Sequence, residues 1–310
     1  MKKLSSCIIF AGLTVPMAST AMAEGPIDGT IYGKINTAII SHDNGATDEV
    51  RMVNNASRLG IKGKTDLDDA MSVVYKLEYE IAPDESAADK GGSGIFKQRN
   101  AYVGLGTSVG TFLAGRHDTP LKSAQGKIDL FNDLQVGDIK NIVNGEERIS
   151  NIFIYRSPEF NNLQVEAATQ FEDDPAKDDG TSVSLKYNRD NLYVAAAVDS
   201  KVDGMDVVRL AGQYKLDALT VGAILNQSEA SSGGSAENGF IVSGSYKVDS
   251  LTLKAQVASS DEKAKGGQQV ALGVDKKLGK KTKAFVYFAQ VEDDVNAKKS
   301  ASGVGLEHKF

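Results

Sequence analysis

The sequence predicts a closed antiparallel transmembrane β-barrel of about sixteen strands. Three observations predict it: a final segment that alternates apolar and polar residues up to a terminal aromatic, the same alternation in many stretches of about ten residues, and connections that alternate between short and long. Such strands exist in lipid only when both edges are paired, because each unsatisfied backbone group there costs several kcal/mol.

The first 23 residues have the pattern of a secretory signal peptide. Lys2 and Lys3 give a basic start, residues 4–15 are largely apolar, and Ala21-Met22-Ala23 is a small-residue cleavage site. A transmembrane helix needs about 20 apolar residues, more than this stretch offers. We expect residues 24–310 to form one exported barrel domain without a transmembrane helix.

Composition narrows the chemistry. The only cysteine, Cys7, lies in the signal peptide, which excludes disulfides, thiolate metal sites and cysteine nucleophiles from the exported part. We expect neither a metal nor a cofactor. Without the two signal lysines, 33 Lys and Arg oppose 41 Asp and Glu, a formal charge of −8 that disfavours nucleic-acid binding. A mean hydropathy of −0.25 fits a barrel with one lipid-facing and one water-facing side.

The alternation runs through nearly the whole mature chain. One example is Leu163, Val165 and Ala167 against Gln164 and Glu166. Strands are expected to begin near residues 29, 51, 71, 95, 109, 149, 161, 181, 191, 205, 218, 239, 250, 268, 281 and 300. Residues 189–191, 217–218 and 249–250 are tight turns, whereas 172–180, 228–238 and 261–268 are longer, as in barrels with short inner turns and long outer loops.

A soluble β-sandwich is the alternative, since alternation also suits a half-buried sheet. The missing second aromatic layer disfavours it.

The last strand identifies the membrane face. Val304, Leu306, His308 and Phe310 share one parity, and Glu307 lies on the other. For the barrel to close, this strand must pair with the first strand near residues 29–35. We therefore expect Phe310 to contribute to closure and assembly.

Between residues 116 and 148 the alternation fails, and a connection that long in a compact domain is usually functional. Residues 127–134 predict a short helix with Leu130 and Leu134 on one stripe and Asp129 and Asp133 on another. Asp138 adds negative charge. These carboxylates make sense if cations face them across a gap; a solvated acidic surface loop is the alternative.

Four strands carry basic residues that supply such cations: Lys34, Arg58, Arg99 and Arg156. Lys34 has parity opposite to Ile31 and Ile35, Arg58 to Leu59 and Ile61, and Arg99 to Phe96 and Tyr102. A lipid-facing arginine costs about 2–4 kcal/mol at the midplane, so lumenal placement is preferred. The parity of Arg156 is ambiguous, because residues 152–155 are apolar on both faces.

The chain resembles the general, non-specific porins of the bacterial outer membrane, in their shorter-chain branch. The segments that carry the resemblance occur in the family's order: Gly29-Thr30-Ile31-Tyr32-Gly33-Lys34, Ser57-Arg58-Leu59-Gly60-Ile61-Lys62-Gly63, Arg99-Asn100-Ala101-Tyr102-Val103-Gly104-Leu105, Gly115-Arg116-His117-Asp118-Thr119-Pro120, Tyr155-Arg156-Ser157-Pro158 and Phe310.

The resemblance implies sixteen strands per barrel, a homotrimer in outer-membrane lipid, and a third loop, 116–148, that folds inward and narrows the pore. It also implies a basic wall of Lys34, Arg58, Arg99 and Arg156. The loop lacks the family's commonest acidic motif, which leaves Asp129, Asp133 and Asp138 as candidates for the facing acidic group.

The expected function is a water-filled channel for passive diffusion of small hydrophilic solutes and ions. Carboxylates on the loop and guanidinium groups on the wall would create a transverse field at the narrowest point.

An anion- or organic-acid-selective channel of the same fold is the nearest alternative. A barrel enzyme is remote, because His42, His117 and His308 lack a visible Ser and Asp constellation. An adhesin or receptor barrel would need longer external loops. Ion preference does not follow from net charge, since only charge near the constriction sets it.

Overall fold

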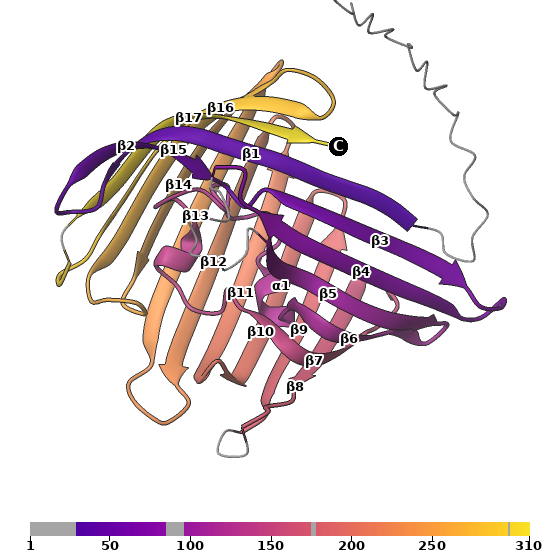
Figure 1. Ribbon diagram of the computed structural model, residues 1–310. Helices are drawn as coiled ribbons and strands as arrows, with labels where there is room; N and C mark the ends of the chain where they lie inside the picture. The colour runs from indigo at the N-terminus through magenta and orange to yellow at the C-terminus, as the bar shows by residue number, and fades with distance from the viewer. Residues whose placement is uncertain (1–28, 85–95, 175–177, 297) are drawn as a thin grey trace, which may run out of the picture.

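The computed structural model describes residues 29–84, 96–174, 178–296 and 298–310, and in them the chain is a twisted antiparallel sheet closed into a barrel (Figure 1). The predicted signal peptide lies outside the described residues. The strands are β1 (Gly29–Asp43), β2 (Asp48–Asn54), β3 (Arg58–Asp66), β4 (Ser72–Ile81), β5 (Phe96–Thr107), β6 (Gly110–Asp118), β7 (Arg148–Arg156), β8 (Leu163–Gln170), β9 (Gly180–Arg189), β10 (Leu192–Val202), β11 (Met205–Leu216), β12 (Leu219–Ala230), β13 (Glu237–Val248), β14 (Leu251–Ser260), β15 (Gly267–Lys277), β16 (Thr282–Glu292) and β17 (Lys299–Lys309). Among the described residues, no helix is long and apolar enough to cross a bilayer.

Sixteen barrel strands result from these seventeen, because β2 and β3 are two parts of one. Both pair with β1: β2 through Asn54 opposite Thr37, and β3 through Arg58 opposite Lys34. β2 starts three residues before the expected position 51, and every strand from β4 to β17 starts within two residues of its expected position. The prediction of a closed sixteen-stranded barrel is confirmed.

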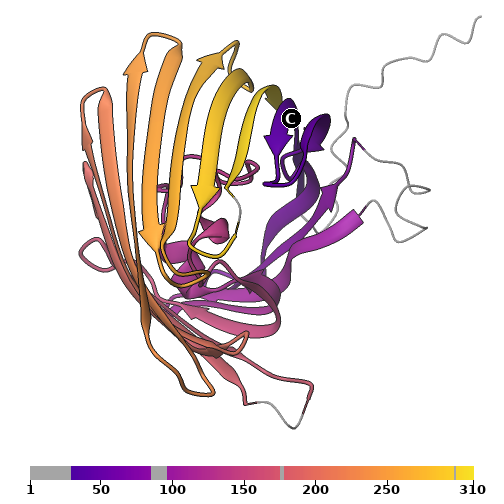
Figure 2. The ribbon, with the colours of Figure 1, turned by 90° about the vertical axis from the view of Figure 1, so that its left-hand side faces the viewer.

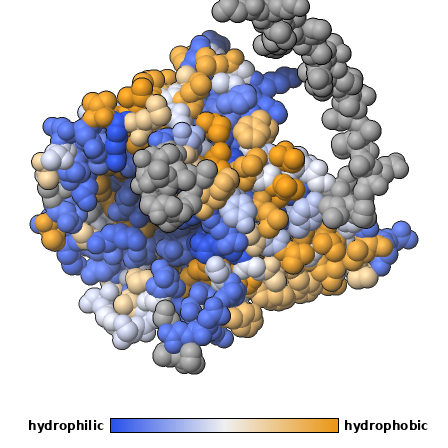
Figure 3. Space-filling view, viewed as in Figure 1, coloured by the Kyte–Doolittle hydropathy of each residue, from blue (hydrophilic) through white to orange (hydrophobic). Residues whose placement is uncertain are grey.

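The two faces of the wall differ in polarity as the alternation predicts. In β11, Val208 and Leu210 are exposed on the outside, whereas the intervening Arg209 is fully buried inside. Figure 3 shows hydrophilic surface in the hollow of the molecule and hydrophobic surface along the outside of the strands at the lower right. Apolar residues that would be a liability on a soluble protein are thus placed where lipid covers them.

The chain ends close the barrel. β1 pairs with β17 in antiparallel register from Lys34 opposite Lys309 to Asp43 opposite Ser300. Phe310 extends this seam, since its backbone N–H donates to the Gly33 carbonyl at 3.1 Å and its carbonyl accepts from the Gly33 N–H at 3.3 Å. The ring lies over Gly33, where an added Cβ would lie 2.4 Å from the ring carbon Cζ. Glycine at this position therefore makes room for the terminal aromatic.

The long connection between β6 and β7, residues 119–147, lies inside the barrel (Figure 2). It contains α1 (Pro120–Ala124) and the 3₁₀ helix η1 (Ile139–Asn141). The predicted helix over 127–134 is wrong. Turns replace it, with Asp133 at φ 69° and Val136 at φ 64°, because the loop must bend repeatedly to follow the wall.

Apolar packing holds this inner loop against the wall. Leu121, Ile128, Ile139, Ile142 and Val143 of the loop pack against β10–β14. Phe131, Leu134 and Val136 pack against β1, β2 and β15–β17. Small residues face the loop from the wall and leave space for these larger side chains: Ala195, Ala197, Ala211, Ala258, Ala271, Ala289 and Ala301. The loop therefore fills one side of the lumen as a packed core.

Candidate functional site

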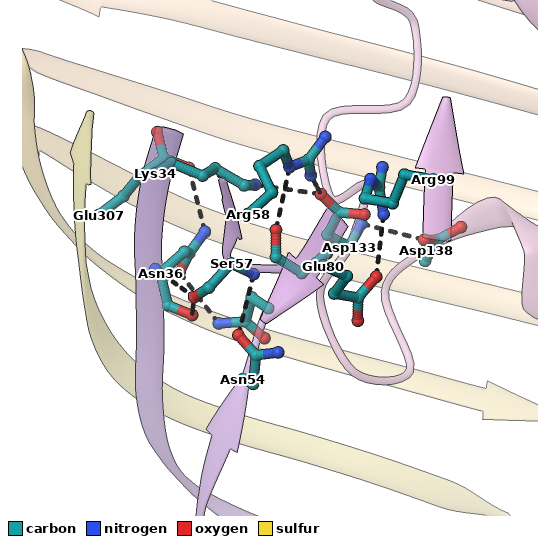
Figure 4. Close-up of polar contacts among 12 residues, drawn as sticks. Lys34, Asn36, Asn54, Ser57, Arg58, Glu80, Arg99, Asp133, Asp138 and Glu307 are labelled. Carbon is teal, nitrogen blue, oxygen red and sulfur yellow. Dashed lines mark hydrogen bonds and ion pairs between the residues drawn. The ribbon is translucent and has the colours of Figure 1, made fainter. Parts of the chain in front are cut away.

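One carboxylate of the inner loop meets the basic wall directly. The Asp133 Oδ2 atom lies 2.6 Å from an Arg58 guanidinium nitrogen and 3.1 Å from Lys34 Nζ (Figure 4). Despite its partial burial, the charges of Lys34, Arg58 and Arg99 hold the pKa of Asp133 below its ordinary value. Asp133 is therefore ionised at neutral pH.

An interruption between β2 and β3 aims Arg58 into the lumen. Met52 is lipid-exposed before the interruption and Leu59 after it, so the outward parity changes from even to odd. Ala56 takes a left-handed φ of 51°, and the buried Ser57 hydroxyl accepts from the Asn36 N–H at 2.8 Å. This local irregularity places Arg58 opposite Lys34. Bulges next to functional sites commonly redirect a side chain in this way.

A second irregularity positions Arg99. The pairing of β4 with β5 shifts between Leu77 and Tyr79. Arg99 then contacts two carboxylates of β4, with Nε 3.0 Å from Glu78 and a terminal nitrogen 3.0 Å from Glu80. The expectation that Tyr102 faces outward is wrong. The shift turns it into the lumen, where its ring lies 5.1 Å from that of His117.

The other two acidic candidates accept hydrogen bonds from the backbone of the loop and stabilise its conformation. The Asp129 carboxylate accepts from the Phe131 and Ile139 N–H groups at 2.9 and 3.2 Å. Asp138 caps η1 and accepts from the Asp133 N–H at 2.9 Å, which holds Asp133 in its left-handed conformation. Among the described residues, the structure therefore brings only Asp133 of the three onto the basic wall; Asp129 and Asp138 form no ion pair with Lys34, Arg58 or Arg99.

Arg156 lies away from the other three basic residues. It ends β7, eight residues beyond Arg148, or about 26 Å along an extended strand. Its Nε lies 2.5 Å from Glu166, which also pairs with Lys186. In the described residues its ion pair is thus with the neighbouring strand and not with the inner loop, which contradicts its expected place opposite the loop.

A fully buried arginine anchors the end of the loop, and sequence reasoning missed it. Arg209 of β11 binds Glu146 at 2.6 Å, the Asn144 carbonyl at 2.9 Å and the Asn226 side chain at 2.8 Å. Glu262 accepts from the Asn144 N–H at 3.0 Å. The inward parity of Arg209 was visible in the sequence, but the distant Glu146 gave no signal of pairing with it.

Two glutamines of β14 and β15 hold the middle of the loop. The Gln256 Oε1 accepts from the Leu130 N–H at 3.0 Å, and Gln269 donates to the Val136 and Asp138 carbonyls at 2.6 and 3.1 Å. Both glutamines are almost fully buried. Their bonds satisfy loop backbone groups where the loop has no regular structure. The loop is therefore pinned to the wall at residues before and after Asp133.

The space left between the loop and the basic wall is a polar cavity of about 610 Å³. Seven cationic side chains and five carboxylates line it among the described residues. The cations are Arg58, Lys97, Arg99, Arg116, Lys122, Lys140 and Arg148, and the carboxylates are Glu80, Asp118, Asp133, Glu146 and Glu147.

Comparison with known proteins identifies the family. Residues 9–296 match the Gram-negative porin family. The chain belongs to the Gram-negative porins. Its relatives include the major outer membrane protein P.IB of Neisseria lactamica, 24% identical, and that of Neisseria meningitidis, 25% identical, each aligned over the full length of both chains.

Solved porin structures share the fold. An anion-selective porin from Comamonas acidovorans superposes with a TM-score of 0.80 at 21% identity, covering 92% of this chain and 100% of that one. OmpF of Salmonella typhi, in complex with daunomycin, gives a TM-score of 0.75 at 15% identity, covering 92% and 98%. OmpT of Vibrio cholerae, in its trimer form, gives 0.69 at 16% identity, covering 92% and 100%.

This porin is therefore an outer-membrane channel for passive diffusion and not an enzyme. The expectation of a porin, made from the order of short segments, is confirmed.

Proposed function

We propose that Asp133, together with Lys34, Arg58 and Arg99, forms the constriction of a diffusion channel for small hydrophilic solutes. The observation that carries this proposal is the contact of the Asp133 carboxylate with Arg58 and Lys34, at the edge of the cavity that Asp133, Arg58 and Arg99 line. A carboxylate held on one side and cations on the other produce a field across the passage. Dipolar solutes align in that field, whereas a bulky apolar solute must displace ordered water without a compensating contact.

The channel prefers small anions over cations. Cations outnumber carboxylates by seven to five in the cavity lining, and pairing within the lining leaves that excess unchanged. The similarity to a porin described as anion-selective supports the same preference. The negative net charge of the exported chain does not oppose it, since charge near the constriction sets selectivity.

Reversal potentials in a KCl gradient test this function with the purified protein in planar bilayers. Asp133→Asn removes the charge and keeps a residue that tolerates a left-handed backbone. A unit charge about 6 Å from a permeating ion is worth about 0.7 kcal/mol in water, or roughly a threefold change in permeability ratio. We expect Asp133→Asn to increase anion preference by about that factor and Arg58→Gln to decrease it.

Asp203→Asn is the matched control. Asp203 also has a left-handed φ, 52°, but lies in the exposed turn between β10 and β11. It should leave the reversal potential unchanged. If stepwise conductance is absent from the wild-type protein, the channel function fails; if Asp133→Asn and Arg58→Gln behave like Asp203→Asn, the constriction assignment fails while the channel stands.

We also propose that three copies of the chain assemble in the outer membrane. The support is the trimer form of the structurally similar OmpT of Vibrio cholerae. Native mass spectrometry of the detergent-extracted protein tests the stoichiometry, and a monomeric or dimeric mass would contradict it.

A further inference from the structure

A second group of cations surrounds a hollow at the short-turn end of the barrel, on β14–β17. The hollow has a volume of about 230 Å³. Lys277, Lys280, Lys281, Lys283 and Lys309 line it, and the hairpin between β15 and β16 supplies four of the five. Short turns lie on the periplasmic side of bacterial barrels, so this hollow opens at the periplasmic mouth.

The lysines are brought together by register. Lys277 lies directly opposite Lys283 in the pairing of β15 with β16, so two like charges share one face. Like charges directly opposite one another destabilise a sheet. The Lys309 N–H donates to the Lys281 carbonyl at 2.8 Å, which places a second pair of cations side by side.

The carboxylates at this hollow are already engaged. Asp275 lies 3.0 Å from Lys254 and 2.9 Å from Lys283. Glu307 accepts from Asn36 at 3.0 Å and lies 3.5 Å from Lys309.

In the described part of the chain, Lys277, Lys280 and Lys281 form no ion pair within 4.0 Å, although the hollow's own carboxylates lie nearby. Three uncompensated ammonium groups around one hollow therefore remain available to an anion that approaches from the periplasm.

The same register links this hollow to the constriction. Lys281 neighbours Lys309, Lys309 lies opposite Lys34, and Lys34 lies opposite Arg58. Directly opposite residues of antiparallel strands point to the same face. Because barrel strands are tilted, a row across them rises along the axis. The four cations thus form a continuous lumenal row from the periplasmic mouth to the cations that meet Asp133.

We propose that the hollow lined by Lys277, Lys280 and Lys281 is a binding subsite for a small multivalent oxyanion, from which the row of cations leads to the constriction. Ammonium groups bind phosphate-like oxyanions as point charges, and several of them favour a multiply charged ion over chloride. The inference rests on the proposed passage of anions through this channel, and it assigns the lysines at the mouth a role separate from that of Asp133.

Single-channel recordings with inorganic pyrophosphate test the subsite in the full-length mature porin. Pyrophosphate is added to one side of the bilayer at a time. It should cause concentration-dependent current interruptions only from the side that the periplasmic mouth faces. The double variant Lys277→Gln/Lys281→Gln should weaken the apparent affinity roughly tenfold, since each exposed charge pair contributes modestly. Lys215→Gln, which alters a lysine on another periplasmic hairpin, should match the wild type.

The outcomes separate this subsite from the constriction. If Arg58→Gln abolishes the interruptions while Lys277→Gln/Lys281→Gln does not, the anion binds at the constriction and the subsite is refuted. Equal interruption from both sides, or an equal loss in Lys215→Gln, also refutes it. Wild-type conductance and reversal potential in KCl serve as the separate readout of the proposed channel function, which survives each of those results.

Discussion

At the scale of single residues, three aspartates within ten positions of one loop have different tasks. Asp133 contacts the basic wall, whereas Asp129 and Asp138 accept hydrogen bonds from the loop's own backbone. Their sequence context is similar, and no helical or strand periodicity distinguishes them. What separates them is the course of the backbone through positive φ at Asp133 and Val136. The sequence could therefore nominate the three carboxylates but could not choose among them.

The titration of Asp129 predicts a pH-dependent loop. Removal of its carboxylate from water, with the nearby charge of Asp138, raises the pKa of Asp129 from 3.8 to about 7. Because the folded-state pKa lies above the unfolded value, the folded protein binds more protons than the unfolded protein at pH values between the two. This contribution to stability is fully present below pH 3.8 and is lost as pH rises through about 7.

Asp129→Asn should remove that pH dependence. The amide cannot ionise, although it replaces one of the two acceptor oxygens by a donor and should lower stability at acidic pH. Denaturant unfolding in detergent between pH 5 and pH 8 measures how the free energy of unfolding changes with pH. The surface variant Asp203→Asn is the control. A slope equal to that of the wild type would show that Asp129 does not cause the effect.

At the scale of elements, the sequence predicts regular strands well and irregular ones poorly. Alternation locates the strands because lipid and water impose opposite demands on successive side chains. It fails at the interruption before Arg58 and at the register shift beside Arg99, where one extra residue reverses the parity. The outward prediction for Tyr102 was wrong for this reason. The alanines that make room for the inner loop were equally hidden, since alanine suits either face of a strand.

The closing seam yields a prediction about assembly. Deleting Phe310 removes both backbone hydrogen bonds to Gly33 and the ring that covers it, whereas Phe310→Ala removes the ring alone. We expect the yield of folded barrel in detergent refolding to fall in the order wild type, Phe310→Ala, deletion. Ion selectivity of the pores that do form should not change, because Phe310 faces outward, away from Asp133.

Glycine variants provide an independent test of the seam. In Gly33→Ala the new Cβ would lie 2.6 Å from the Arg58 carbonyl oxygen, so backbone must move. Gly212→Ala in β11 meets no atom within 4 Å and serves as the matched control. Equal refolding yields for the two variants would contradict the tight packing at the seam.

At the scale of the whole molecule, ion preference arises from the distribution of many charges around the lumen. The carboxylates of the exported chain outnumber its cations, yet the cations prevail in the cavity between the loop and the wall. Net charge therefore does not indicate the proposed anion preference. In the proposed passage of anions, the row from Lys281 to Arg58 would extend the basic surface to the periplasmic mouth.

A preference set by such a field must weaken with salt. The Debye length is about 10 Å at 0.1 M ionic strength and about 3 Å at 1 M, so at 1 M a charge acts only on ions in its immediate neighbourhood. We expect the permeability ratio from reversal potentials to approach the ratio of free ion mobilities at 1 M KCl. Liposome influx of an uncharged sugar, which depends on pore size alone, should be the same at both salt concentrations. If the ion preference is unchanged at 1 M, direct contact with individual cations sets the selectivity, and the long-range field does not.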